Sequence, residues 1–286
     1  MKKVNWRNVL EEFPLPREDP GVKGEIEGEL SPPKVVLFDV YGTLVKPLIG
    51  DLEAQLRNQM SVESFEETIR RFGLPKGIGE DLYRGFYSKI NEIHESLRTL
   101  GIKQPEVLIE HVWMELLAEK DIRISVEDAR SLAIFREMKA NPVAAFSGAG
   151  DCLKKLKQRN IKLGIVSNSQ FYTMPILGRA LKIDLDQVFD REIVFLSYEV
   201  GFAKPDPYFF LLVRTKLAIT GTDPGEVVVV GNDWINDIMA SRKFGFQALF
   251  FRGEGREQEY DPATIGDGCA VAFNYNQVKT LLGIRG

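Results

Sequence analysis

From Lys34 onward the chain carries short apolar runs in which every position is hydrophobic, not every second one. This composition is typical of strands buried on both faces of a parallel sheet, because both rows of side chains then enter the core. The runs are VVLF at 35–38, LGIV at 163–166, IVFL at 193–196, VVVV at 227–230 and ALFF at 248–251. The pattern therefore predicts a parallel sheet.

Helical patterns separate these runs. The segments are 150–160, 175–183, 205–219 and 233–245. Alternation of strand and helix is typical of an α/β domain in which helices cover both faces of the sheet. We therefore expect a three-layer, doubly wound parallel sheet of Rossmann type.

One long segment interrupts the alternation with helical periodicity and almost no strand signal. Apolar residues recur there at three- and four-residue spacing in 61–73, 80–101, 105–117 and 125–138, which predicts amphipathic helices. Residues 46–146 are accordingly interpreted as an inserted helical cap, between core segments 34–45 and 147–286. Residues 1–33 are rich in charge, proline and glycine and are predicted to form an extended N-terminal arm, with a short helix around 6–13.

Composition narrows the possible partners. The chain has 286 residues, with 37 basic against 41 acidic side chains and a net charge of −4, so no basic surface for a nucleic acid is indicated. No apolar stretch approaches the ~18 residues of a membrane span, and the start lacks a signal-peptide core. We expect a cytoplasmic protein that acts on a small molecule without nucleic-acid or membrane partners. The sequence leaves the oligomeric state open.

Polar residues follow four of the apolar runs. In an open parallel sheet the ligand binds at the carboxyl ends of the strands, where these residues would meet. They are Asp39 and Thr43 after the first run, Ser167 and Asn168 after the second, Lys204 after the third, and Asp233 and Asp237 after VVVV. The sequence thus predicts one pocket that contains a carboxylate, hydroxyls, an amide, a lysine and an acidic pair.

The order and spacing of these groups from Lys34 to Phe273 resemble the haloacid dehalogenase superfamily, whose members carry a cap like the predicted one. The resemblance implies that Asp39 is a nucleophile that forms a covalent aspartyl intermediate. It further implies that Lys204 neutralises charge developing in the transition state. Thr43, Ser167 and Asn168 would then bind the transferring group as substrate-binding residues.

The acidic pair has two interpretations. Asp233 and Asp237 are four residues apart at a predicted helix start, so they could merely complement the helix dipole. Alternatively, Asp39 and Asp233 would be ligands of Mg²⁺, with Asp237 as a direct or indirect ligand. The resemblance implies that the main-chain carbonyl of Tyr41 is a further ligand of the metal.

Tyr41 occupies the position at which phosphatases of this superfamily carry a second acid. That acid protonates the leaving oxygen and then activates water, and tyrosine, with an unperturbed pKa of about 10, is a poor base for the second step. The D-x-Y-G-T pattern resembles the L-2-haloacid dehalogenases, whose halide leaves without a proton. Those enzymes are metal-independent and need no acidic cluster such as NDWIND, and Arg57 is only a positional candidate for their substrate-binding arginine.

Three functions remain open at this point. The preferred one is Mg²⁺-dependent hydrolysis of a small phosphorylated metabolite through an aspartyl-phosphate at Asp39. The second is metal-free hydrolytic dehalogenation of a 2-haloacid by the same nucleophile. The third is a non-catalytic binding protein with the same fold, although a pure scaffold has no need of buried charges.

Overall fold

The structure is a computed structural model that describes residues 2–48, 54–254 and 260–284, with only the backbone described for 54–60. The chain divides into two compact units. One, called the cap unit below, comprises Met1–Leu15 and Pro47–Val143, and the other, the core unit, comprises Pro16–Lys46 and Ala144–Gly286.

Within the described residues, the core unit is built on a seven-stranded sheet in the order β1-β9-β8-β7-β2-β5-β6. All neighbours pair in parallel except β1, which is antiparallel to β9. The strands are β1 (Glu27–Glu29), β2 (Val35–Phe38), β5 (Lys162–Ser167), β6 (Val194–Leu196), β7 (Val227–Gly231), β8 (Gln247–Phe251) and β9 (Cys269–Ala272). The five predicted strands are thereby confirmed to within a residue or two.

Two neighbouring strands, the edge strand β1 and its partner β9, were not predicted, for different reasons. β9 has the sequence CAVA and is fully buried, but its small side chains give a weak apolar signal. β1 has the sequence EGE and is largely exposed, so no apolar run marks it. It is held by backbone pairing with β9, and it needs glycine at position 28, where φ is 70° and a Cβ would lie 2.1 Å from the Cys269 carbonyl oxygen.

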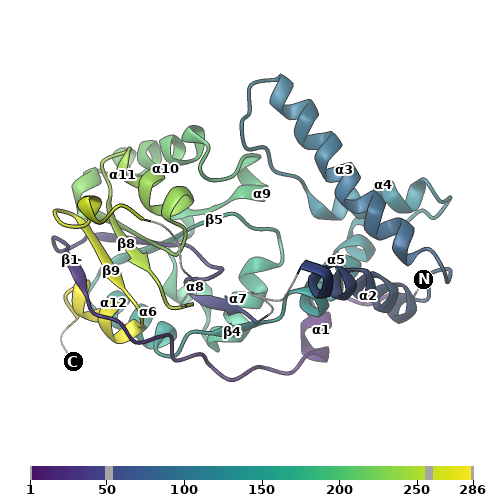
Figure 1. Cartoon of the computed structure of the whole chain (residues 1–286), viewed down its shortest axis with the longest axis horizontal. Coiled ribbons are helices and arrows are strands. Elements are labelled where there is room, and N and C mark those ends of the chain that lie inside the picture. The colour runs from purple at the N-terminus through teal and green to yellow at the C-terminus, as the bar shows by residue number, and fades with distance from the viewer. Residues whose placement is uncertain (1, 49–53, 255–259, 285–286) are drawn as a thin grey trace. The chain divides into compact units, whose positions relative to one another are not determined.

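Helices cover both faces of the sheet, which confirms the predicted three-layer fold. Figure 1 shows α10 and α11 on one side and α6 and α12 on the other. The helices of this unit are α6 (Ala149–Gln158), α7 (Thr173–Leu181), α8 (Leu185–Val188), α9 (Ser197–Val200), α10 (Pro207–Ile219), α11 (Ala240–Arg242) and α12 (Tyr275–Leu281). A π-helical segment, Trp234–Met239, precedes α11, and short 3₁₀ turns span Arg191–Ile193, Pro224–Glu226 and Pro262–Thr264.

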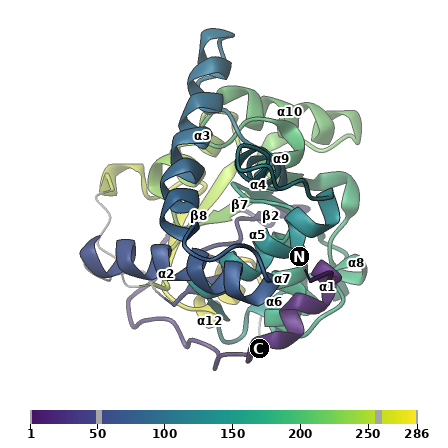
Figure 2. The ribbon, with the colours of Figure 1, turned by 90° about the vertical axis from the view of Figure 1, so that its right-hand side faces the viewer.

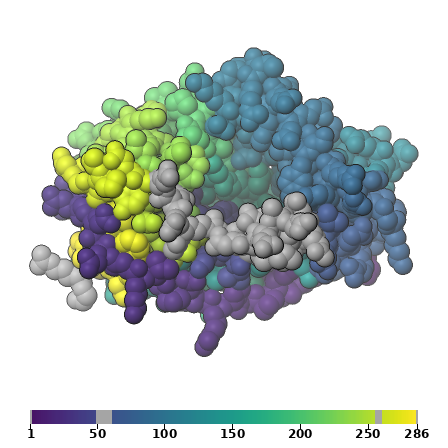
Figure 3. Space-filling view, viewed as in Figure 1, coloured from purple at the N-terminus to yellow at the C-terminus, as the bar shows by residue number. Residues whose placement is uncertain are grey.

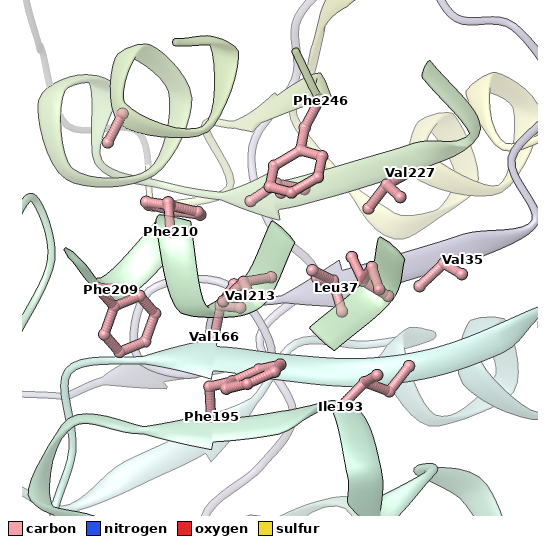
Figure 4. Close-up of a cluster of buried hydrophobic side chains, with 13 residues drawn as sticks. Val35, Leu37, Val166, Ile193, Phe195, Phe209, Phe210, Val213, Val227 and Phe246 are labelled. Carbon is pink, nitrogen blue, oxygen red and sulfur yellow. The ribbon is translucent and has the colours of Figure 1, made fainter. Parts of the chain in front are cut away.

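The core below α10 explains why the strand runs are apolar at every position. Leu37 of β2 packs in a buried cluster with Phe209, Phe210 and Val213 of α10 (Figure 4). The neighbouring strand residue Val36 is equally buried, although successive side chains of a strand point to opposite faces. Burial of each such side chain contributes about 1.5–3 kcal/mol, so both faces of the sheet stabilise the unit.

The cap unit consists of helices, as predicted. They are α1 (Trp6–Val9), α2 (Ala54–Phe72), α3 (Gly79–Thr99), α4 (Ile109–Ala118) and α5 (Val126–Ala140), and Figure 2 shows α3 along its length. The helix predicted at 61–73 begins earlier, at Ala54. At the start of α5, Ser125 and Asp128 form a reciprocal capping box. Inside the unit, Phe65 stacks on Trp113 with ring centroids 5.1 Å apart.

The N-terminal 33 residues are shared between the two units. Trp6, Val9 and Leu10 are buried in the cap unit, where α1 is followed by a 3₁₀ turn, Leu10–Glu12. Residues 16–33 belong to the core unit, and in Figure 3 their purple atoms lie beside the yellow atoms of the C-terminal part. A two-stranded sheet of β3 (Val45–Pro47) and β4 (Val143–Ala145) forms where the chain leaves and re-enters the core.

Candidate active site

Strands β2, β5 and β7 lie side by side, and the residues that follow them lie at the same edge of the sheet. Phe38, the last residue of β2, lies opposite Ile165 of β5 and Val230 of β7. Asp39 continues the ladder for one more bond, because its amide donates to the Val230 carbonyl at 2.9 Å. Its carboxylate therefore emerges at the carboxyl edge of the sheet, as the sequence predicted.

A buried lysine joins two of the predicted acids. Lys204 Nζ donates to Asp39 Oδ1 at 2.9 Å, to the Val166 carbonyl at 2.8 Å, and to Asp237 Oδ1. The side chains of Lys204 and Asp237 are each 2% exposed and that of Asp39 is 9% exposed. The three donors of the ammonium are thus all used. Two carboxylates share one ammonium, which leaves one negative charge uncompensated in this cluster.

The electrostatics of the cluster keep the lysine charged. Burial alone lowers the pKa of Lys204, but the carboxylates of Asp237 and Asp39 outweigh burial, so its pKa is raised. Burial raises the pKa of Asp237 to about 6, and the nearby Asp39 adds to this while Lys204 opposes it. Lys204 is therefore a fixed positive charge beside Asp39.

Thr43 and Asn232 lie on the other side of the Asp39 carboxylate. Thr43 Oγ1 is 3.4 Å from Asp39 Oδ2 and 3.3 Å from Asn232 Oδ1, and its single hydrogen can serve one of them at a time. Gly42 has φ of 84°, and a Cβ there would lie 2.0 Å from Asn232 Nδ2. Glycine is thus required where the loop after β2 passes the amide of Asn232.

Asn232 was not predicted as a site residue. It is the first residue after β7, the position to which the strand-end rule points most directly. Asp233 and Asp237 were preferred as metal ligands, because a carboxylate is a stronger metal ligand than an amide. The strand-end position itself was the signal that could have identified it.

Ser167 and Asn168 are at the same edge but have different surroundings. Ser167 is fully buried, and its Oγ has no hydrogen-bond partner among the described residues. An unpaired buried hydroxyl calls for an explanation, such as a ligand that is absent. Asn168, in contrast, bonds through both amide atoms to the main chain of Lys204.

Two tyrosine hydroxyls connect the loop that follows β2 with helices of the core unit, one from Tyr41 in the loop itself and one from Tyr275. The hydroxyl of Tyr41 is 3.1 Å from Thr173 Oγ1 at the start of α7. Tyr275 of α12 donates its hydroxyl to the Thr43 carbonyl at 2.9 Å, and burial raises its pKa well above the usual value. No sequence pattern connects Tyr275 with this loop, since it is 232 residues away from Thr43.

Asp233 has a different environment from the one expected of a metal ligand. Its Oδ1 accepts from the amides of Ile235 and Asn236 at 2.9 and 2.8 Å, and its Oδ2 accepts from Asn236 Nδ2 at 2.9 Å. It therefore caps the π-helical segment, which is the helix-start alternative considered above. Asp237 Oδ2 accepts from the Asp233 amide at 3.0 Å, so both oxygens of Asp237 are engaged within the protein.

These contacts bear on the fit of a divalent cation. No group of three His, Cys, Asp or Glu side chains that could hold a metal occurs in the described residues. Asp39 Oδ2 and Asn232 Oδ1 both lie near Thr43 Oγ1, and the cluster has an uncompensated negative charge. Mg²⁺ is commonly held by one or two carboxylates, further oxygens and a substrate phosphate. The residues present fit such a site, with Asp39 as its carboxylate.

The capping role of Asp233 gives a prediction. Asp233→Ala should lower the free energy of unfolding by about 0.5–2 kcal/mol, because three donors lose their acceptor. Asp233→Asn keeps a capping oxygen and should restore most of that loss, which urea unfolding of both variants would measure. If Asp233 were instead a direct ligand, Asp233→Asn would weaken Mg²⁺ binding in calorimetry while stability stayed near that of the parent.

The family assignment rests on a match that covers most of the chain. The sequence profile of the haloacid dehalogenase-like hydrolases matches residues 33–245. The chain belongs to this family. It is accordingly a hydrolase with an inserted helical cap, and the resemblance inferred from the strand-end residues is confirmed.

Individual relatives include phosphatases and a dehalogenase. The chain is 27% identical over 233 residues to a phosphoserine phosphatase from Thermus thermophilus, covering 76% of this chain and 88% of that protein. It is 29% identical over 137 residues to (S)-2-haloacid dehalogenase 4A from Burkholderia cepacia, covering 48% of this chain and 53% of that protein. The similarity to the phosphatase thus extends over much more of both chains.

A solved structure supports the fold. The structure of a HAD phosphatase from Thermococcus onnurineus superposes with a TM-score of 0.51 and 21% identity, covering 87% of this chain and 97% of that one. No helix of the described residues is long and apolar enough to cross a membrane. The side chain of Arg57 lies outside the described part of the structure.

Proposed function

We propose that this hydrolase is a Mg²⁺-dependent phosphatase that cleaves a small phosphorylated metabolite through an aspartyl-phosphate at Asp39. The observation that carries the proposal is the oriented carboxylate of Asp39, with Oδ1 bonded to Lys204 and Oδ2 beside Thr43. The extent of similarity to the Thermus phosphatase supports transfer of a phosphoryl group over displacement of a halide.

Asp39 Oδ2 is the attacking oxygen in this proposal, because Oδ1 is already hydrogen-bonded to Lys204. It forms a bond to phosphorus while the bond from phosphorus to the ester oxygen breaks, and the leaving oxygen takes up a proton. Water then attacks the aspartyl-phosphate, which releases inorganic phosphate and restores the carboxylate. Division of one difficult hydrolysis into two displacements is the usual benefit of a covalent nucleophile.

The surrounding groups stabilise the charge on the phosphoryl oxygens. The hydroxyls of Thr43 and Ser167 bind these oxygens, and a ligand at Ser167 would satisfy its unpaired Oγ. Asp39, the Tyr41 carbonyl and Asn232 would hold Mg²⁺, which supplies positive charge to the phosphoryl group when bound. Asp237 contributes by holding Lys204.

Dehalogenation of a 2-haloacid is the second candidate, and one observation favours it. Asp233 and Asp237 both have protein partners, so the acids that the sequence offered for a metal are engaged elsewhere. A metal-free dehalogenation needs only the nucleophile and a leaving group that requires no proton. It therefore needs no acid at position 41, and Tyr41 is compatible with it.

The two candidates differ in their response to a chelator. We expect p-nitrophenyl phosphate to be hydrolysed, the activity to disappear after EDTA treatment, and excess Mg²⁺ to restore it, because the metal offsets charge on the phosphoryl oxygens. The same preparations should release no halide from 2-chloropropionate. Halide release that EDTA leaves unchanged, without phosphate release, would establish dehalogenation instead.

A further inference from the structure

We propose that Asn168 is a positioning residue whose carboxamide fixes the main chain of Lys204 and thereby places the ammonium group beside Asp39. From the sequence, Asn168 was expected to contact the transferring group together with Ser167. The catalytic consequence of this inference rests on the proposed phosphatase function, whereas the positioning itself does not.

The contact between the two residues has two hydrogen bonds of good length. Asn168 Oδ1 accepts from the Lys204 amide at 2.7 Å, and Asn168 Nδ2 donates to the Lys204 carbonyl at 2.9 Å. One planar carboxamide thus bonds both main-chain groups of a residue 36 positions away. Two bonds from one rigid group fix the orientation of that peptide segment as well as its distance.

The other end of the lysine is held by the same strand end. Lys204 Nζ donates to the Val166 carbonyl, two residues before Asn168. The segment 166–168 therefore holds Lys204 at its main chain and at its ammonium group. Ser167 is the last residue of β5 and Asn168 is the first residue after it, and their side chains have different surroundings. Ser167 keeps its unpaired hydroxyl for a ligand, and Asn168 holds the lysine.

Lys204 needs such support because of where it lies. It is in the loop between α9, which ends at Val200, and α10, which begins at Pro207, so no regular ladder fixes its main chain. Its flexible four-carbon stem adds several rotatable bonds between the main chain and the ammonium. A misplacement of about 1 Å in a catalytic group can reduce the rate about 10²-fold.

Removal of the carboxamide should therefore reduce turnover more than substrate binding. We expect Asn168→Ala to lower kcat by roughly 10- to 100-fold through displacement of Lys204, with little change in KM, in assays with p-nitrophenyl phosphate. Asn168→Asp keeps an acceptor for the Lys204 amide and should give an intermediate kcat. Asn276→Ala, which removes an exposed asparagine from α12, is the matched control and should leave both constants unchanged.

A second measurement follows the lysine directly and requires no substrate. The ¹⁵N resonance of the Lys204 ammonium, recorded on the full chain, reports its three hydrogen bonds. In Asn168→Ala this resonance should shift or broaden beyond detection, and in Asn276→Ala it should match the parent.

The two readouts separate the possible failures. A raised KM with unchanged kcat in Asn168→Ala would show a direct substrate contact and overturn the proposal. An unchanged ammonium resonance would overturn it as well, whatever happens to the rate. If the parent hydrolyses no phosphate ester, the proposed function fails, and the resonance alone then decides whether Asn168 positions Lys204.

Discussion

Asp39→Asn is expected to abolish phosphate release while the fold is retained or becomes slightly more stable. The loss should be about 10⁴-fold or more, the scale on which removal of a catalytic nucleophile lowers kcat in other enzymes. An amide oxygen of asparagine cannot form the aspartyl-phosphate, so no partial mechanism through this side chain remains. Steady-state assays at saturating Mg²⁺ would measure the effect.

The expectation for stability follows from the charges around Lys204. The parent buries two carboxylates, Asp39 and Asp237, with one ammonium. Asp39→Asn leaves one carboxylate and one ammonium, so a buried unpaired charge is removed, not created. Urea unfolding should therefore give a midpoint at or above that of the parent. Asp261→Asn, which alters an exposed cap of a 3₁₀ turn, is the matched control for a loss of carboxylate charge.

One result would contradict the assignment of the nucleophile, and another would contradict the expected stability. Turnover that persists in Asp39→Asn, in protein purified from a host without background phosphatase, would exclude Asp39 as the nucleophile. A marked drop in stability would show that Lys204 depends on Asp39 more than on Asp237, and the loss of activity could then reflect a disordered site.

The sequence predicted the central sheet well because local composition dictates it. A run such as VVVV at 227–230 is shielded from water only when both faces of its strand are buried, and this run forms the central strand of the sheet. The position of Asp39 at the carboxyl edge of the sheet could be predicted because it directly follows such an apolar run. The outer strand β1 was not predicted because its pairing with residues 269–271 depends on backbone bonds between segments more than 200 residues apart.

The partners of each site residue could not be predicted to the same degree. Spacing alone placed Asp233 and Asp237 on one helix face, but the segment after Asp233 is π-helical and Asp233 bonds to its exposed amides. Asn168 and Lys204 illustrate the same limit, since their contact joins two loops that are distant in sequence. Residue type and position relative to the strands indicate which side chains lie at the edge of the sheet. Their hydrogen bonds in the folded chain decide which of these side chains face a ligand.

Tyr41→Asp is expected to change how strongly the rate of phosphate-ester hydrolysis depends on the pKa of the leaving group. The hydroxyl of Tyr41 contacts Thr173 Oγ1 at 3.1 Å, and a phenol with an unperturbed pKa of about 10 is a weak proton donor near neutral pH. The parent should therefore prefer acyl or aryl phosphates, whose leaving groups need no proton, over simple sugar phosphates. Its rates for aryl phosphates should fall steeply as the leaving-group pKa rises.

A carboxylic acid at position 41 would donate a proton as the bond to the leaving oxygen breaks. Tyr41→Asp should flatten the dependence on leaving-group pKa and recover part of the ~10²–10⁴-fold typical of general acid catalysis for the poorest leaving groups. The measurement is a series of aryl phosphates of graded pKa, assayed with both proteins at fixed Mg²⁺. Tyr41→Phe, which removes only the hydroxyl bonded to Thr173, is the control for loss of that contact and should keep the slope of the parent.

The slopes of rate against leaving-group pKa in the three proteins distinguish the possible roles of position 41. A flatter slope in Tyr41→Asp alone shows that position 41 faces the leaving group and that the parent lacks an acid there. A flatter slope in Tyr41→Phe as well would attribute the change to the freed Thr173 instead of the new carboxyl group. Equal slopes in all three proteins would mean that position 41 does not face the leaving oxygen, or that another residue already protonates it, and the preference for activated phosphates would then be wrong.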